Sequence, residues 1–373
     1  MTPARATFAL LLSASAAAQA ADAPDFAREV RPILAAKCFN CHGFDAAARK
    51  GGLRLDDGAA ALLPAKSGAL AIVPGKPAES ELLHRIADRD DPMPPAETGK
   101  SVTAAEADIL KRWIAAGAVY VPHWAFAAPI AAKLPEVRRS DWPRNPIDRF
   151  VLARLEREGL SPSTEADPAR LLRRVSLDLT GLPPRPDDLR TFLADPAPGA
   201  YERAVDRLLA SPAYGERMAV DWLDAARYAD SNGFFRDNTR QIWPWRDWVI
   251  RAFNRNQPFD AFTVEQLAGD LLPQPTDEQR IATGFNRNHM VTGETGVIDE
   301  EYRVEYVADQ VETTAAVWMG LTLGCARCHD HKFDPLTQKD YYRLFAFFDR
   351  SVEKALVNPD DPPPVMIVAE DAQ

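Results

Sequence analysis

Cysteine, histidine and methionine are all scarce in this sequence. Its 373 residues include 4 cysteines, 6 histidines and 6 methionines. So low a cysteine content in so long a chain excludes a small scaffold held together by disulfides. No stretch after residue 20 provides the roughly 20 consecutive apolar residues that a membrane-spanning helix needs, so we expect no membrane span in the mature protein.

Positive charge is also in deficit. The chain has 44 Lys and Arg against 54 Asp and Glu, which gives a formal net charge of −10 at pH 7. Proteins that bind nucleic acid neutralise its phosphates with Lys and Arg. An acidic chain of this kind is therefore not expected to bind nucleic acid.

All the cysteines occur in two copies of one motif. Residues 38–42 read Cys-Phe-Asn-Cys-His, and residues 325–329 read Cys-Ala-Arg-Cys-His. In such a segment the two thiols are spaced to add across the two vinyl groups of one haem, and the imidazole then lies beneath the iron as its proximal ligand. The two motifs predict two covalent haem c groups. The attachment residues are Cys38, Cys41, Cys325 and Cys328, and the iron ligands are His42 and His329.

Zinc and disulfide chemistry are the alternatives for these cysteines. The paired segments of a four-thiolate zinc site usually lie about 15 to 20 residues apart, whereas most of the chain separates these two pairs. A redox-active dithiol needs only one pair and no following histidine. The histidine after both pairs favours haem attachment, and zinc and disulfides remain the alternatives.

The first 20 residues have the features of a secretory signal peptide. A basic residue, Arg5, precedes an apolar run that begins at Phe8, and residues 18–20 form an Ala-Gln-Ala cleavage site. The run is too short for a membrane anchor. Export agrees with the haem interpretation, because bacteria attach haem c on the outer side of the inner membrane. We expect a periplasmic or secreted protein.

Residues 25–121 are predicted to form a small cytochrome c domain. Apolar residues at helical spacing predict an amphipathic helix over residues 25–37, which leads into the first motif. Ser80 is expected to cap a short helix, and Thr103 with Glu106 has the capping-box pattern of a last helix. The buried face of that last helix is expected to consist of Ile109, Leu110, Trp113 and Ile114.

Met93 is the leading candidate for the sixth ligand of the first iron. Residues 91–95 read Asp-Pro-Met-Pro-Pro, and the prolines would hold the thioether on a stiff loop facing the iron opposite His42. A thioether raises the reduction potential relative to a second histidine. The competing candidate is His84, although a lone histidine in a helix is more often a surface or packing residue. Core filling is the other interpretation of Met93.

Further short runs accompany these motifs. They are Val-Arg-Pro-Ile-Leu at 30–34, Gly-Gly-Leu-Arg-Leu-Asp at 51–56, Ile-Val-Pro-Gly at 72–75 and Trp-Ile-Ala-Ala-Gly-Ala at 113–118. With the first haem motif and the methionine loop, this region resembles the Planctomycete cytochrome C domain. The resemblance implies a module that binds haem and transfers electrons.

A connector over residues 122–142 leads into a second domain predicted over residues 143–350, and residues 351–373 form a proline-rich tail. The 31 prolines suggest many short helices separated by turns, and no strand-like alternation persists. We therefore predict a mostly all-α fold, in which a larger helical domain carries the second haem c loop. Its first helix opens at Asn145-Pro146 and is expected to bury Ile147, Phe150, Val151 and Leu155.

The sixth ligand of the second iron is open to argument. His331 lies too close to His329 in sequence to reach the other face of the same iron, and Met319 is expected to be a core residue. His289 is the candidate we select, with the adjacent Met290 as its rival. An empty sixth position is the third alternative, and it would change the function.

Residues 230–248 interleave arginines with aromatic residues. This pattern fits either a platform for sugars or haem propionates, or a loop whose tryptophans are buried, and we favour burial. Carboxylates also cluster in sequence around the second haem motif, where they would act as general acids and bases or, more commonly, cap helices and solvate a surface. They are Glu294, Asp299, Glu300, Glu301, Asp330 and Asp334.

Three runs characterise residues 143–350. They are Trp-Pro-Trp-Arg-Asp-Trp at 243–248, the fifteen residues from Pro258 to Leu272, and Gly-Cys-Ala-Arg-Cys-His-Asp-His-Lys-Phe-Asp-Pro at 324–335. This region resembles the domain of unknown function that follows the Planctomycete cytochrome C domain in large secreted proteins. Members of that family are similar in carrying a further C-terminal domain. Because this sequence stops after the tail, we expect a truncated form or a partner chain that supplies the missing domain.

The sequence thus predicts a secreted dihaem c-type cytochrome that passes electrons between redox partner proteins. One alternative is a haem-dependent redox enzyme that acts on a carbohydrate-derived substrate. Another is a binding or scaffold module with a structural haem. Whether the protein is an enzyme is left open at this stage, because it depends on whether the second iron has a free position.

Overall fold

A computed structural model describes residues 23–350, together with residues 365, 366 and 368. Within 23–350 it leaves out His123, Arg236, Thr295, Lys332 and Phe333. The predicted signal peptide and nearly all of the predicted tail lie outside the described residues. The chain divides into two compact units, Met1–Lys133 with Asp330–Pro335 and Leu134–His329 with Leu336–Gln373.

The described residues form helices and isolated β-bridges but no strand, which confirms the mostly all-α prediction. In this part of the chain no helix is both long and apolar enough to cross a membrane.

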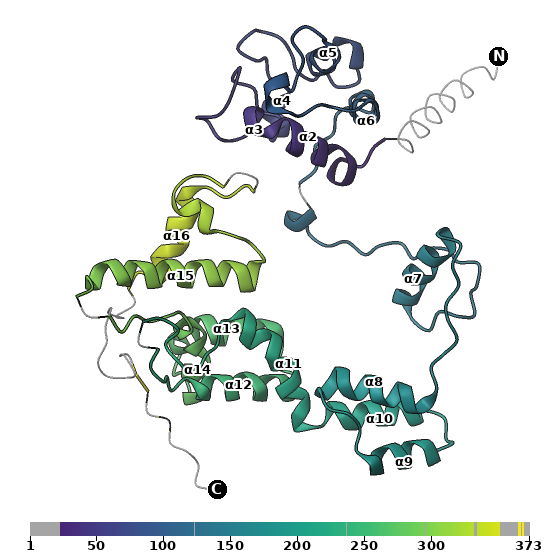
Figure 1. Ribbon diagram of the computed structural model, residues 1–373, viewed down its shortest axis with the longest axis vertical. Coiled ribbons are helices and arrows are strands. Elements are labelled where there is room, and N and C mark those ends of the chain that lie inside the picture. The colour runs from purple at the N-terminus through teal and green to yellow at the C-terminus, as the bar shows by residue number, and fades with distance from the viewer. Residues whose placement is uncertain are drawn as a thin grey trace, which may run out of the picture. The chain divides into compact units, whose positions relative to one another are not determined.

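The first unit consists of short helical elements around one apolar core (Figure 1). In chain order they are η1 (Phe26–Val30), α2 (Arg31–Lys37), α3 (Phe39–His42), α4 (Gly58–Ala61), η2 (Pro77–Glu79), α5 (Glu81–Ala87), η3 (Ala96–Thr98), α6 (Ala104–Ala115) and η4 (Trp124–Phe126).

The opening and closing elements of this unit pack through three aromatic rings. The Phe26 ring in η1 lies 5.6 Å from the Trp113 ring in α6 and 4.7 Å from the Tyr120 ring, between centroids. Trp113 and Tyr120 meet edge to face at 5.2 Å. Aromatic clusters of this kind contribute much of the energy of a small core. They bring the two ends of the unit together around the first haem motif.

The start of α6 agrees with its prediction. The Thr103 hydroxyl accepts a hydrogen bond from the Glu106 N–H at 3.2 Å, and the Glu106 carboxylate accepts one from the Thr103 N–H at 2.7 Å. Leu110, Trp113 and Ile114 are buried, and Ile109 packs at the edge of the core.

Ser80 precedes α5, but its side chain does not cap that helix. The side chain is fully buried; its hydroxyl accepts a hydrogen bond from the Val73 N–H at 2.9 Å and donates one to the Lys76 carbonyl at 3.0 Å. The side-chain cap prediction is wrong because the preceding loop folds back and provides closer partners than the helix N-terminus does.

The second unit is a longer series of helices. They are α7 (Pro146–Arg157), α8 (Pro168–Thr180), α9 (Pro186–Ala194), α10 (Ala200–Leu209), α11 (Pro212–Ala225), α12 (Trp243–Asn254), α13 (Phe259–Ala268), η5 (Gly269–Leu271), α14 (Asp277–Ala282), η6 (Thr283–Arg287), α15 (Asp299–Met319), η7 (Gly324–Arg327) and α16 (Gln338–Phe348). Four of them, α7, α8, α9 and α11, begin with proline, whose missing N–H would have no intrahelical partner at this position.

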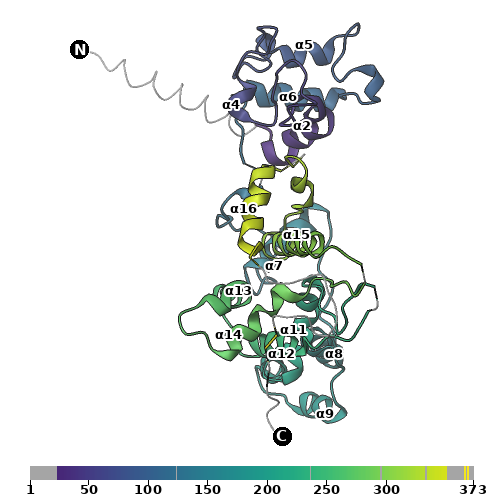
Figure 2. The ribbon, with the colours of Figure 1, turned by 90° about the vertical axis from the view of Figure 1, so that its left-hand side faces the viewer.

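Two apolar clusters stabilise the part of this unit that carries the second motif. In the first, α11 and α12 lie side by side (Figure 2). The Trp248 ring stacks on the Phe262 ring with 5.5 Å between centroids. Trp245 and Trp248 are almost completely buried, which confirms the burial interpretation of these tryptophans. In the second cluster, α15 packs against α16 through Val311, Ala315 and Tyr341 (Figure 1).

The inward face predicted for α7 is wrong. Ile147 is 72% exposed, Phe150 and Val151 are also exposed, and Leu155 is half-buried, whereas the buried apolar residue is Leu152. The helix itself begins as predicted, with a reciprocal cap between Asn145 and Asp148. Periodicity identified the helix, but it did not identify the side that the rest of the unit covers.

Candidate functional site

The first haem motif occupies a single helical turn. The N–H of Cys38 donates to the Leu34 carbonyl at the end of α2, and the N–H of His42 donates to the Cys38 carbonyl at 2.9 Å. Positions three and four residues after Cys38 lie on the same face of a helix, so Cys41 and His42 share that face. Both cysteines are half-buried free thiols. One helical turn thus carries two free thiols and one imidazole, the three groups that attach and bind a haem c.

Burial controls the chemistry of this turn. It raises the pKa of the Cys38 thiol to about 12, although the cation of Lys100 acts in the opposite direction. Burial is also the main cause that lowers the pKa of His42; the Lys50 backbone opposes it, and the charge of Arg85 adds to it. The neutral imidazole that results is the form that binds iron. Its Nδ1 is buried without a hydrogen-bond partner.

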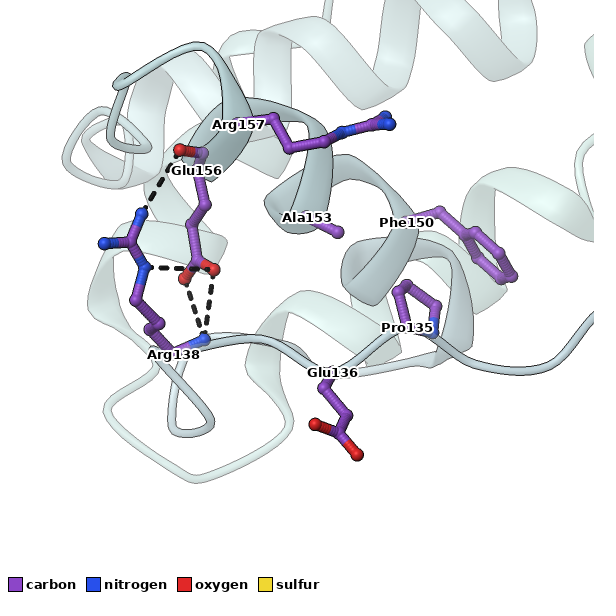
Figure 3. Close-up of a pocket in the computed structure, with 7 residues that line it drawn as sticks. All are labelled: Pro135, Glu136, Arg138, Phe150, Ala153, Glu156 and Arg157. Carbon is purple, nitrogen blue, oxygen red and sulfur yellow. Dashed lines mark hydrogen bonds and ion pairs between the residues drawn. The ribbon is translucent and has the colours of Figure 1, made fainter. Parts of the chain in front are cut away.

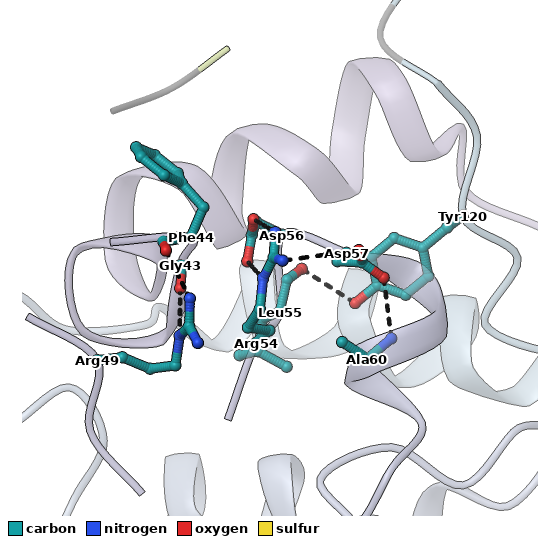
Figure 4. A network of polar contacts seen from close by, with 9 residues as sticks. All are labelled: Gly43, Phe44, Arg49, Arg54, Leu55, Asp56, Asp57, Ala60 and Tyr120. Carbon is teal, nitrogen blue, oxygen red and sulfur yellow. Dashed lines mark hydrogen bonds and ion pairs between the residues drawn. The ribbon is translucent and has the colours of Figure 1, made fainter. Parts of the chain in front are cut away.

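The loop after this motif is held by backbone-directed contacts (Figure 4). The Arg49 guanidinium donates to the carbonyls of Gly43 at 2.9 Å and Phe44 at 2.5 Å. The N–H of Leu55 donates to the His42 carbonyl at 2.8 Å. The Tyr120 hydroxyl donates to the Leu55 carbonyl at 3.2 Å, which ties this loop to the aromatic cluster. The backbone around His42 is therefore fixed before any ligand is bound.

Gly43 is required for this geometry. A Cβ at this position would lie 2.3 Å from the Phe39 carbonyl oxygen, too close for any side chain. We expect Gly43→Ala to shift the backbone next to His42 and to destabilise the protein by about 1–3 kcal/mol, the usual cost of overpacking. Chemical denaturation of the purified protein measures this change. Unchanged stability and haem content would show that the turn relaxes freely.

The Met93 loop is fastened at both ends. The N–H of Met93 donates to the Arg85 carbonyl at 2.9 Å, and the Arg85 guanidinium donates to the Asp91 carboxylate at 2.6 Å. Beyond the loop, the Lys100 ammonium donates to the Ala36 carbonyl of α2 at 2.7 Å. The half-buried Met93 is thus held beside the end of α5, and Lys100 ties the segment that follows the loop to α2.

His84, the competing ligand, has a side chain that is 58% exposed and lies 3.6 Å from the Glu81 carboxylate. This placement fits the surface role expected for a lone helical histidine.

The second motif follows α15 and forms η7. Cys325 and Cys328 are exposed free thiols, and His329 is also exposed. The N–H groups of Cys328 and His329 both approach the Cys325 carbonyl at 3.4 Å. Ala326 is completely buried in the cluster between α15 and α16, which turns its neighbours outward.

Arg327 anchors this turn to both neighbouring helices. Its guanidinium forms a bidentate ion pair with the Glu305 carboxylate of α15, at 2.9 and 2.5 Å. Its carbonyl accepts hydrogen bonds from the Gln338 amide at 3.1 Å and the Tyr342 hydroxyl at 3.2 Å. The hydrogen bonds from Arg327 hold the pKa of Glu305 below its usual range. The second turn is therefore as firmly positioned as the first, although its thiols are more open.

His289 lies in the interior of the second unit. It is 2% exposed, and its ring stacks on Tyr306 at 4.8 Å. The backbone carbonyl of His289 accepts a hydrogen bond from Arg240 at 2.8 Å. His289 therefore stays a predicted ligand, and its ring would have to leave Tyr306 to bind an iron at the exposed second motif.

Two methionines near the second motif are accessible. Met290, the rival of His289, is 53% exposed. Met319, which was expected in the core, is 48% exposed at the end of α15, so that expectation is wrong. The helix ends at this residue, and Gly320 takes the left-handed conformation that follows it.

Zinc is the alternative use of these cysteines. Among the residues that the structure describes, no three His, Cys, Asp or Glu side chains are grouped so that they could hold a metal ion. Each unit contains one cysteine pair, whereas a four-thiolate zinc site needs two. The two thiols and the following histidine of each motif fit a covalently bound haem instead.

Comparison with known families agrees with both resemblances. A family model described as Planctomycete cytochrome C matches residues 38–97, and one described as a protein of unknown function (DUF1549) matches residues 146–353. The second match covers more than half of the chain. The chain belongs to the DUF1549 family. Its N-terminal part is a cytochrome c-like domain, which indicates haem binding. No curated protein and no solved structure matches this chain.

This DUF1549 chain also has a shallow pocket at the start of its second unit (Figure 3). Its volume is about 460 Å³. The Glu156 carboxylate in its wall accepts hydrogen bonds from the Arg138 N–H, at 3.0 Å for each oxygen. The lining residues are Pro135, Glu136, Arg138, Phe150, Ala153, Glu156 and Arg157. Neither motif contributes to the pocket, so we assign it no part in haem binding.

Sequence reasoning missed the arginines that hold the loop after the first motif, the Met93 loop and the second motif in place. Arg49, Arg85 and Arg327 use backbone carbonyls or distant carboxylates as partners. A single sequence contains no signal for such pairs, because the partners become neighbours only in the folded chain. Gly43 was also missed, although a glycine directly after the motif is a signal that could have indicated the close backbone approach.

Proposed function

We propose that this DUF1549 protein is a periplasmic or secreted dihaem c-type cytochrome that transfers electrons between redox partner proteins. One observation carries the proposal: both Cys-x-x-Cys-His segments form a single turn that follows a helix, with two unpaired thiols and a histidine at its end. Haem c would supply one-electron chemistry at each turn. The periplasmic or secreted location agrees with the site of covalent haem attachment in bacteria.

The protein's own residues would have distinct tasks at the first haem. Cys38 and Cys41 would attach the porphyrin, and the neutral imidazole of His42 would bind the iron. The Met93 loop, held by Arg85, would present its thioether to the other face. A histidine–methionine pair favours the reduced state and suits an electron carrier.

At the second haem, Cys325 and Cys328 would attach the porphyrin and His329 would bind the iron. The Arg327–Glu305 ion pair would fix the turn on α15. We propose that His289 completes the coordination after its packing on Tyr306 changes, with the accessible Met290 as its rival. A saturated iron at both sites would make electron transfer the main activity.

The test is the absorption spectrum of the reduced, periplasmically matured protein with and without carbon monoxide, normalised to haem per chain. We expect two haems per chain and no spectral change on adding carbon monoxide. A change confined to the second haem would indicate an open iron and favour the enzyme alternative. A single haem per chain would contradict the dihaem proposal.

A further inference from the structure

An exposed apolar patch lies at the start of α15. Phe234, Phe235, Met290 and Ile298 are 42%, 51%, 53% and 65% exposed. The Phe234 ring lies 6.5 Å from the ring of Tyr302, which follows Ile298 by one helical turn. We call these five residues the apolar patch. Exposed apolar groups gathered in this way are typical of interaction surfaces.

The patch is built from three segments that hold one another in place. The N–H of Gly293 donates to the Phe235 carbonyl at 3.2 Å, and the N–H of Val291 donates to the Asn232 carbonyl at 3.0 Å. A Cβ at Gly233 would lie 3.1 Å from the Met290 side chain, which shows how closely the two loops approach. The apolar side chains are therefore exposed on a fixed backbone.

Carboxylates surround the patch. Glu300 is paired with Arg303, but the others form no ion pair within the described part of the chain. Arg236, which is adjacent to Phe235 in sequence, lies outside the described residues. The exposed carboxylates are Asp237, Glu294, Asp299, Glu300 and Glu301. An apolar centre with an acidic rim fits a partner whose own apolar contact is ringed by Lys and Arg.

The patch is also close to the second haem motif. Tyr302 and Glu305 are three residues apart on α15, a rise of about 4.5 Å along the helix. The Glu305 carboxylate holds Arg327, which lies between the two cysteines of the motif. One rigid helix thus joins the patch to the turn that would carry the second haem.

We propose that the apolar patch and its acidic rim are the docking surface for a basic redox protein that exchanges electrons with the second haem. This inference rests on the proposed dihaem function. Contacts between redox proteins are small and transient, so a centre of a few apolar residues is sufficient. Opposite charges around the centre accelerate encounter and orient the partners.

The test uses oxidised mitochondrial-type cytochrome c, whose haem edge is surrounded by lysines, as the probe. Stopped-flow mixing with the reduced protein gives the second-order electron-transfer rate over a range of salt concentrations. We expect the rate to fall steeply as salt increases. Replacing Asp237, Glu294 and Glu301 together with lysine is expected to lower the low-salt rate by about tenfold and to flatten its salt dependence.

Control variants distinguish an effect of docking on the electron-transfer rate from an effect of the protein's net charge. Asp188→Lys, Glu202→Lys and Asp206→Lys on α9 and α10 change the net charge equally but should leave most of the rate intact. Phe234→Ser with Phe235→Ser should lower the rate several-fold even at high salt, and Leu193→Ser, at an exposed site on α9, should not. Equal effects of patch and control changes would overturn the docking proposal, and so would a rate that salt does not affect.

A chain with Cys325→Ala and Cys328→Ala distinguishes this proposal from the proposed function. Binding of the isotope-labelled probe, followed by its NMR shifts, should persist in this chain and weaken in the charge-reversal chain. If the unaltered protein contains one haem yet binds the probe at the patch, the dihaem proposal fails while the docking surface stands. If it contains two haems and the probe binds elsewhere, the docking proposal fails while the dihaem proposal stands.

Discussion

Replacing Cys325 and Cys328 together with alanine is expected to halve the covalently bound haem per chain. Each thiol forms one thioether bond, so a motif without both cysteines cannot retain haem through denaturation. The first motif belongs to a separate compact unit with its own apolar core and should keep its haem. The haemochrome spectrum of the denatured protein, together with its intact mass, measures the loss.

The reciprocal change, Cys38→Ala with Cys41→Ala, is the matched control. It should leave one haem, now with the spectrum and potential of the second site. If the Cys325 and Cys328 change left haem content unaltered, the second motif would not be an attachment site, and the proposed dihaem function would be wrong.

Replacing Met93 with alanine is expected to lower the reduction potential of the first haem while leaving its attachment intact. A thioether stabilises the reduced iron, and its loss leaves water or a nitrogen ligand in the sixth position. Axial ligands set haem potentials over a range of about 0.8 V, so we expect a decrease on the order of 0.1 V or more. A potentiometric titration monitored by absorbance measures it.

His84→Ala is the control for Met93→Ala, because His84 is the competing ligand and lies exposed beside Glu81. It should leave the potential unchanged. An unchanged potential in Met93→Ala, with a shift in His84→Ala, would reverse the assignment. The hydrogen bond from Met93 to Arg85 involves only the backbone, so the substitution itself should leave the loop in place.

The sequence by itself determined the features that depend on neighbours along the chain. The two haem motifs are complete within five residues each, because vinyl spacing and one helical turn fix all three side chains. The capping box at Thr103 and the helix start at Asn145 were predictable for the same reason, since the residues involved lie within one turn. Proline at the first helical position likewise favours the start of a helix through its own ring and its missing N–H, so its effect can be predicted from the sequence.

Tertiary structure alone decided which faces are covered and which partners meet. Ile147 and Phe150 are exposed, and His289 is buried against Tyr306. The Ser80 hydroxyl forms its hydrogen bonds with the preceding loop instead of with the N-terminus of α5. These outcomes depend on contacts between residues far apart in sequence. Hydrophobic periodicity predicts that a helix has an apolar face, but it does not predict which element packs on that face. The link from the apolar patch through α15 to Arg327 arises in the same way, from segments that become neighbours only in the folded chain.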